Sequence, residues 1–309
     1  MMDKQKIVID SCVFFHMLKY NDIFEKDGLK AVVAEGLQDQ KEYEKTRAEL
    51  DNFMTTVLKD KQAKSKIPFT FDKKLSLCDS LLSNKSTAFP QDIKDEYKKL
   101  HDAYAKAKTY SFVGELFHRH KTGYCDFYLS PTSIDEIKYH RDLPKDKRRT
   151  EEEKQEYFDA DRINNFARTC CKKLNLTEEM KRDAAVLSEI LRGKIELDGL
   201  ELPKAPMGSK KSDMNKNGVF GDSLIMAECG VAGMTLVTQN AKDFIFDKGI
   251  ALDEKGVQNT ARRDGIEKIF NHLGISKEAR PYTVEEFLNK TASYKGLEKT
   301  LDGDDGFSR

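Results

Sequence analysis

The chain has 309 residues, which suffices for two domains or for one domain with a large insertion. Its 53 Lys and Arg residues balance 53 Asp and Glu residues, so no overall field favours nucleic acid or anionic lipid, and a site for a polyanion must be local. No stretch approaches the roughly 18 apolar residues that span a bilayer, and the six cysteines include no CxxC pair. We therefore expect a globular protein of the cytoplasm that uses no membrane span, disulfide scaffold or zinc ribbon.

A buried strand and a long helical region open the chain. Residues 6–10 (KIVID) form a β-branched apolar run that is typical of a strand buried on both faces, and the run ends on a carboxylate. From residue 21 to about residue 121, apolar side chains recur three and four apart, with breaks at Pro68 and Pro90. This second pattern predicts helices and no strand.

Strands and helices alternate in the rest of the chain. Thr150 and Glu153 have the form of a capping box, which begins a helix. The predicted elements are, in chain order, a strand at 124–130, a helix from 131, helices over 150–174 and 177–193, a loop at 202–221, a helix over 222–229, a strand at 234–238, and a strand at 281–283 that leads into a helix over 284–288.

This alternation predicts a three-layer α/β/α fold, in which helices cover both faces of a central parallel sheet. We assign residues 1–20 and 122–290 to this domain, 21–121 to a helical insertion, and 291–309 to a C-terminal extension that is flexible at its end. In such sheets the functional crevice lies beyond the carboxyl ends of the strands. The acids near those ends are therefore the candidates for chemistry.

Four acids stand at or just beyond the predicted strand ends. Asp10 follows the first strand, and Glu136 lies one turn into the helix after the second. Asp222 is in the first turn of its helix, and Asp243 follows the strand that ends at Thr238. Each alone could be a turn or capping residue. Together they would repel one another unless a cation neutralised them, and oxygen ligands select Mg²⁺ or Mn²⁺.

The segments around these acids form a recognisable set. They are residues 7–14 (IVIDSCVF), 129–137 (LSPTSIDEI), 220–229 (FGDSLIMAEC) and 236–244 (LVTQNAKDF). Their order, with the third segment leading within a short turn into the fourth, resembles the PIN-domain nucleases. The resemblance extends over residues 1–20, 122–192 and 215–290. It leaves the helical insertion unaccounted for.

The resemblance implies roles for individual residues. By their matching positions, the implied metal ligands are Asp10, Glu136, Asp222 and Asp243, and the implied supporting hydroxyls are Ser11 and Thr238. Many members carry an acid two residues after the threonine that ends the strand, where this chain has Asn240. The amide of Asn240 can still orient a carboxylate or a water.

Two basic runs flank the expected site in the sequence. Residues 138–149 hold six Lys or Arg against two Asp, a net charge of +4, and residues 204–216 hold four Lys against one Asp, a net charge of +3. Such local charge helps to hold a nucleic-acid backbone, although the first run can instead pair with the acids at 151–161. In the second run, Lys210, Lys211 and Lys216 are the expected substrate contacts.

The sequence thus predicts a Mg²⁺- or Mn²⁺-dependent nuclease that hydrolyses phosphodiester bonds, and the resemblance implies single-stranded RNA as its substrate. Two alternatives stay open. One is a structure-specific DNA nuclease of the same fold, with the inserted helices over the strand. The other is a non-catalytic nucleic-acid-binding module, in which Asn240 marks lost activity. The nuclease and both alternatives are compatible with a protein partner or a homo-oligomer.

Overall fold

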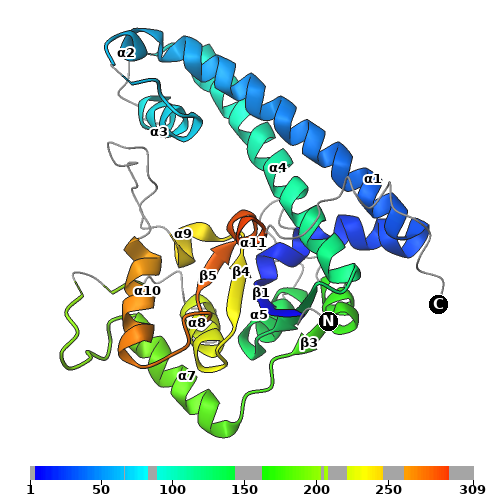
Figure 1. The fold of residues 1–309 in the computed structure, drawn as a ribbon, viewed down its shortest axis with the longest axis vertical. Coiled ribbons are helices and arrows are strands. Elements are labelled where there is room, and N and C mark those ends of the chain that lie inside the picture. Colours follow the sequence, from blue (N-terminus) through cyan, green and yellow to red (C-terminus); the bar gives the residue numbers. More distant parts are fainter. Residues whose placement is uncertain are drawn as a thin grey trace.

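The computed structural model of the chain describes residues 4–65, 67–82, 89–142, 162–202, 205–207, 221–245 and 261–291 (Figure 1). Within these residues the chain is mostly helical and contains a sheet of five parallel strands. The predicted α/β class is confirmed at this level. Among the described helices, none combines the length and the apolar character that a bilayer span requires.

The strands are short and follow a reversed order across the sheet. They are β1 (Gln5–Ile9), β2 (Cys125–Leu129), β3 (Cys171–Lys173), β4 (Thr235–Thr238) and β5 (Pro281–Thr283). Their order is β3-β2-β1-β4-β5. From β1 the chain builds outward on one side to β2 and β3, and on the other side to β4 and β5. The order therefore reverses between β1 and β4.

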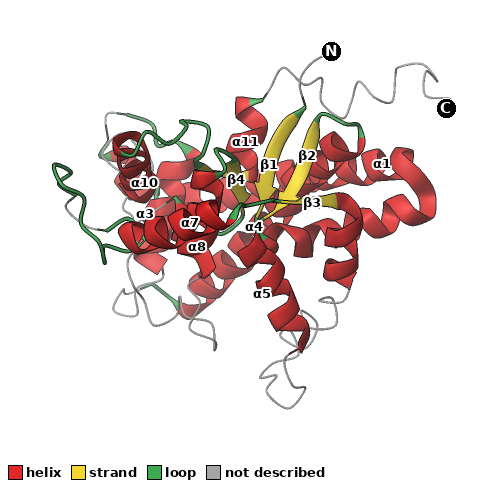
Figure 2. Ribbon diagram, turned by 90° about the horizontal axis from the view of Figure 1, so that it is seen from below, coloured by secondary structure: helices red, strands yellow, loops and turns green. Residues whose placement is uncertain are grey.

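The described helices are α1 (Ser11–Val57), α2 (Lys59–Ala63), α3 (Phe71–Leu82), α4 (Gln91–Lys121), α5 (Pro131–Asp142), a helix over 162–170, α7 (Glu178–Leu191), α8 (Gly221–Val231), α9 (Ala241–Phe244), α10 (Ala261–His272) and α11 (Val284–Lys290). Seen from below, α7, α8 and α10 lie to one side of the strands and α1 to the other (Figure 2).

Each face of the sheet has its own apolar core. Ile7 and Phe127 belong to a cluster that includes residues of α1, α4 and α11, whereas Val8 and Leu236 belong to a second cluster with α7, α8 and α10. Successive residues of β1 therefore enter opposite clusters, as the period of a strand requires. A strand buried on both faces needs a continuous apolar run, which explains why residues 7–9 are all apolar.

The four strands predicted from the sequence are confirmed, with small differences at their ends. The structure adds a fifth strand, β3, which was not predicted. The predicted helix over 150–174 is wrong at its end, because the described helix stops at Cys170 and residues 171–173 form β3. Residues 150–161 lie outside the described part. Residues 171–173 are extended because they pair with β2, and next to them the amide of Leu174 donates to the carbonyl of Leu129 at 2.8 Å. Such tertiary pairing overrides a local helical pattern.

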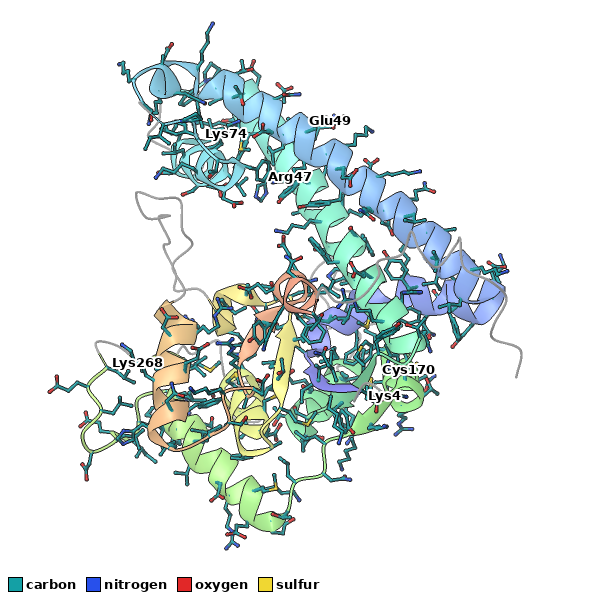
Figure 3. The ribbon with its side chains drawn as sticks, viewed as in Figure 1. Lys4, Arg47, Glu49, Lys74, Cys170 and Lys268 are labelled. Atoms are coloured by element: carbon teal, nitrogen blue, oxygen red, sulfur yellow. The ribbon has the colours of Figure 1, made fainter. Side chains whose placement is uncertain are left out.

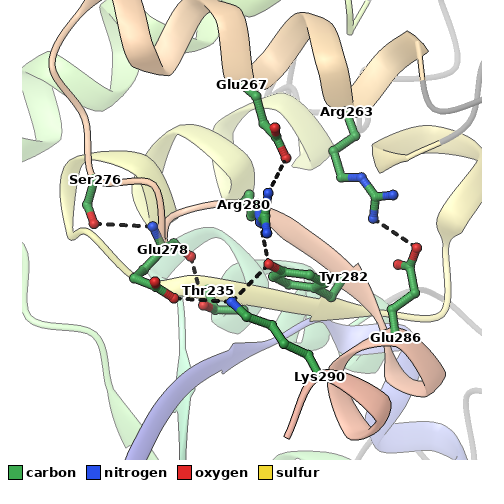
Figure 4. Close-up of polar contacts among 9 residues, drawn as sticks. All are labelled: Thr235, Arg263, Glu267, Ser276, Glu278, Arg280, Tyr282, Glu286 and Lys290. Carbon is green, nitrogen blue, oxygen red and sulfur yellow. Dashed lines mark hydrogen bonds and ion pairs between the residues drawn. The ribbon is translucent and has the colours of Figure 1, made fainter.

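At the opposite edge of the sheet, side-chain hydrogen bonds and ion pairs surround β5 (Figure 4). Arg280, just before β5, pairs with Glu267 of α10 at 2.9 Å, and Lys290 of α11 donates to the hydroxyl of Tyr282 at 3.0 Å. Arg263 of α10 pairs with Glu286 of α11 at 2.9 Å. These contacts join the last strand to the helices on both of its sides.

The part of α1 after Gly28, together with α2, α3 and α4, forms what we call the helical arm (residues 29–121). Its far end projects from the sheet-bearing body (Figure 1), whereas the C-terminal part of α4 packs into the core of that body. Among its described residues there is no strand, as predicted. A separate apolar cluster, which includes Leu50, Met54 and Tyr97, holds its far end together. There, Lys74 of α3, labelled in Figure 3, pairs with Asp51 of α1 at 3.0 Å.

The arm departs from α1 at a break in the helix. Gly28 has φ 77° and ψ −173°, a backbone conformation that favours glycine. Across this break, Lys19 pairs with Glu35 at 2.6 Å, and the hydroxyl of Tyr20 donates to Asp39 at 2.5 Å. Helix α1 runs without interruption through residues 20 and 21, and the break in the helix comes at Gly28.

Candidate functional site

The carboxyl ends of β1 and β4 meet where the strand order reverses. In open parallel sheets, this is the position at which ligands bind. Asp10 directly follows β1, and Thr238 is the last residue of β4. The ends of β4 and β5 lead into α9 and α11 on the side of the body from which the helical arm projects (Figure 1).

Asp10 is held firmly at this position. It is 4% exposed, and its amide donates to the carbonyl of Val237 at 3.0 Å. Its carboxylate Oδ2 accepts from the Thr238 hydroxyl at 2.6 Å and from the Cys12 thiol at 3.0 Å. Although Asp10 precedes α1, its side chain makes no capping hydrogen bond to that helix. The two donors therefore orient the carboxylate for a role other than capping.

The Thr238 hydroxyl has a fixed direction. It accepts from the backbone amide of Asn240 at 2.8 Å, so its own proton is left for the carboxylate of Asp10. Asn240 precedes α9, and its side chain makes no capping hydrogen bond. Thr238 therefore lies beside Asp10, as expected, and the tight turn between β4 and α9 sets the direction of its hydroxyl.

Glu136 approaches Asp10 from the neighbouring helix α5. The Ser11 hydroxyl lies 3.3 Å from Glu136 Oε2 and 3.4 Å from Asp10 Oδ1, so it can donate to either carboxylate. On its other side, Glu136 rests against the start of α8. A Cβ atom at Gly221 would lie only 2.1 Å from Glu136 Oε1, so the carboxylate occupies the space of the missing side chain.

Burial, together with the neighbouring negative charges, raises the pKa of Glu136 to about 7. Burial is the largest cause, followed by the negative charge of Asp10, and Glu228 adds to the effect, while the hydrogen bond from Ser11 opposes it. Burial and the charge of Asp10 also raise the pKa of the Cys12 thiol well above its usual value. Cys12 is therefore a neutral hydrogen-bond donor and not a nucleophile.

The raised pKa of Glu136 predicts that the metal-free protein loses stability as the pH rises. Between pH 4.5, the usual pKa of a glutamate, and about 7, the folded chain keeps a proton that the unfolded chain has released. The free energy of unfolding should therefore fall through this window by about 1 to 3 kcal/mol and level off above it. Urea unfolding in EDTA at several pH values measures this fall.

Glu136→Gln provides the comparison for that titration, because it removes the ionisable group and little else. The difference in unfolding free energy between the variant and the original chain should grow from low pH to neutral pH. A difference that is independent of pH would show that Glu136 titrates normally.

The other expected site residues are placed less completely. Asp222 lies in the first turn of α8 and is partly exposed, next to Gly221. Asp243 belongs to the short helix α9, and its side chain is outside the described part of the structure. Lys210, Lys211 and Lys216 also lie outside the described residues.

The described side chains include no group of three or more histidines, cysteines or acids that could hold a metal ion. What the structure brings together is the pair of carboxylates of Asp10 and Glu136, linked through the Ser11 hydroxyl. A metal ion shared with Asp222 and Asp243 therefore stays a prediction.

Sequence reasoning assigned no role to Gly221, against which Glu136 rests, or to Glu228, whose charge adds to the raised pKa of Glu136. Gly221 appeared only as part of a motif, and Glu228 of α8 appeared as one letter of the same segment. Glu228 is 5% exposed and accepts from the amide and the hydroxyl of Thr132 at 3.2 and 2.9 Å. A signal existed in the segment LIMAEC, where a single acid interrupts apolar and small residues that are mostly buried.

Comparison of the chain with models of known protein families, with curated proteins and with solved structures found no match. The geometry at the carboxyl ends of β1 and β4 and the motif resemblance are therefore the basis for a functional assignment.

Proposed function

We propose that the chain is a nuclease of PIN-like, three-layer α/β/α fold that hydrolyses phosphodiester bonds with Mg²⁺ or Mn²⁺, acting on single-stranded RNA. The observation that carries this proposal is the linkage of Asp10 to Glu136 through Ser11 at the point where the strand order reverses. Two carboxylates in close proximity at a ligand-binding edge are costly to maintain unless they serve a cation.

The donor set fits a hard divalent cation. The side chains at the edge offer carboxylate and hydroxyl oxygens, and the neighbouring Cys12 is a neutral thiol. The charges that raise the pKa of Glu136, those of Asp10 and Glu228, are both negative, so positive charge at this point would relieve a repulsion. In the proposal, the residues that hold the ion are Asp10, Glu136 and Asp222, with Asp243 as the fourth. When bound, such an ion polarises a phosphate oxygen and lowers the pKa of its water.

The chain's own residues prepare this edge for the ion. Thr238 and Cys12 donate to one oxygen of Asp10, and the two hydrogen bonds fix the direction of its carboxylate. Glu136, with a pKa of about 7, holds a proton on its carboxyl in part of the molecules at neutral pH and releases it when a cation binds. Affinity for Mn²⁺ should accordingly rise with pH up to neutrality and little beyond.

The substrate class rests on the motif resemblance and on local charge. Lys210, Lys211 and Lys216 stand shortly before Asp222 in the sequence, where they would neutralise backbone phosphates. The overall charge of the chain is zero, so binding would depend on this segment and not on a general field.

The direct test is cleavage of single-stranded RNA and DNA oligonucleotides by one preparation, with Mn²⁺, Mg²⁺ or EDTA. We expect cleavage of RNA that requires the metal and is lost in Glu136→Gln. Asp135→Asn is the matched control, since Asp135 is the preceding, exposed acid of α5, paired with Lys138 at 3.2 Å. Cleavage of DNA alone would assign the DNA nuclease. If the chain binds RNA but cleaves neither the RNA nor the DNA oligonucleotide, it is the non-catalytic binding module.

The fourth ligand position can be tested by substitution. If Asp243 completes the site, Asp243→Asn should weaken Mn²⁺ binding and activity, and raising the Mn²⁺ concentration should partly restore the rate by mass action. Asn240→Ala should act through orientation, with a loss of about 10 to 100-fold that extra Mn²⁺ does not restore. Cleavage rates measured across a Mn²⁺ series separate the two. An undiminished rate in Asp243→Asn would leave a site of three acids.

A further inference from the structure

Glu228 is a buried acid that the proposed chemistry does not use. It lies near the C-terminal end of α8 and is 5% exposed. Its Oε2 accepts from the backbone amide of Thr132 at 3.2 Å, and its Oε1 accepts from the Thr132 hydroxyl at 2.9 Å. A buried carboxylate is retained only where its hydrogen bonds compensate for the loss of water.

These bonds occur at the start of helix α5. The first backbone amides of a helix have no partner within the helix, and negative charge there is favourable. The Ser130 hydroxyl accepts from the amide of Ser133 at 3.0 Å, while Glu228 accepts from the amide of Thr132. The first turn of α5 is thus capped partly from within and partly by a side chain of α8.

The capping contact and the site contact lie on the same two helices. Thr132 and Glu136 are four residues apart, so they share one face of α5. Gly221 and Glu228 are seven residues apart, two turns of α8, and also share a face. Thr132 contacts Glu228, and Glu136 contacts Gly221, so the helices are joined near both ends of their antiparallel contact.

Two contacts of this kind fix the register of one helix against the other. Loss of the bonds to Glu228 would remove one of these two contacts, and α5 would then be held against the start of α8 only where Glu136 meets Gly221. The position of Glu136 beside the start of α8 therefore depends on a residue two turns away that does not touch the site.

We propose that Glu228 is a positioning residue for the candidate site: by bonding the start of α5, it sets the register of α5 against α8 and holds the carboxylate of Glu136 beside Gly221. The metal-binding part of this inference rests on the proposed function, whereas the placement of Glu136 does not.

Three variants test the contact from both sides. Glu228→Gln removes the charge, Thr132→Val removes the hydroxyl with little change of shape, and Thr132→Ser keeps it. Mn²⁺ affinity is measured by calorimetry, and stability by urea unfolding in EDTA. We expect Thr132→Val and Glu228→Gln to weaken Mn²⁺ binding by about 10 to 100-fold, the usual loss when a supporting contact is removed. Thr132→Ser should bind Mn²⁺ within about twofold of the original chain.

Ser188→Ala is the control for a purely structural effect. Ser188 of α7 shares a buried hydrogen bond of 2.9 Å with Ser223 of α8, away from α5. This variant should lose stability in the same way as Thr132→Val but keep its Mn²⁺ affinity. Equal losses of affinity in Ser188→Ala and Thr132→Val, or none in Thr132→Val, would overturn the positioning role.

A crystal structure of metal-free Thr132→Val tests the placement of Glu136 without any metal. We expect the carboxylate to have moved away from Gly221. A carboxylate that stays against Gly221 would overturn the inference, whatever the Mn²⁺ measurements give. If the original chain binds no Mn²⁺, the proposed function fails, and this structure still decides whether Glu228 places Glu136.

Discussion

Asp10→Asn is expected to reduce metal-dependent cleavage by about 10³-fold or more, because it removes the charge of a carboxylate that we propose to hold the cation. The fold should survive the change. An asparagine at position 10 can still accept from Thr238 and Cys12 through its amide oxygen. Cleavage of a labelled RNA oligonucleotide, measured in single-turnover conditions, gives the size of the loss.

The stability of Asp10→Asn separates this role from a structural one. In EDTA the variant should unfold at the same temperature as the original chain or at a higher one, because the repulsion between Asp10 and Glu136 is gone. A clear fall in the unfolding temperature would show instead that the charge of Asp10 is needed for its hydrogen bonds, as in a structural turn.

Gly221→Ala is expected to damage the site while sparing the fold. A Cβ atom at this position would lie 2.1 Å from Oε1 and 3.3 Å from the carboxyl carbon of Glu136, so the carboxylate must move away. The backbone accepts alanine, since Gly221 is not among the glycines with positive φ. Mn²⁺ affinity should fall by about 10 to 100-fold. The unfolding free energy in EDTA should change by less than about 1 kcal/mol, because alanine favours a helix.

A shorter acid at position 136 tests whether the loss arises from this collision. In the Glu136→Asp background the carboxylate is one methylene farther from α8, so Gly221→Ala should cost less Mn²⁺ affinity there than in the original chain. Equal losses in both backgrounds would mean that position 221 acts through the helix and not through Glu136.

The first strand and its acid could be predicted from the sequence, because both determinants are local. Residues 7–9 are apolar and β-branched, and Asp10 follows them directly, so neighbouring letters are enough to place a carboxylate at a strand end. The break before α4 at Pro90 and the threonine that caps α11, Thr283, are local signals of the same kind.

The elements that sequence reasoning missed depend on distant partners. Strand β3 reads as the end of a helix, because its two lysines carry no apolar alternation and only its pairing with β2 makes it a strand. The contact between Glu136 and Gly221 joins segments far apart in the chain, and it depends on how α5 packs against α8. Gly221 considered alone could simply begin a helix, and Glu136 alone could be an ordinary surface acid, so neither residue by itself predicts the contact.

A crystal of the chain soaked with Mn²⁺ tests the central claim most directly, because anomalous scattering locates the ion independently of any activity. The proposal predicts a single strong peak or a close pair at the carboxyl ends of β1 and β4, in contact with the carboxylates of Asp10, Glu136 and Asp222. Soaking at millimolar Mn²⁺ that gives no peak at this edge, or a peak bound elsewhere on the chain, would contradict it.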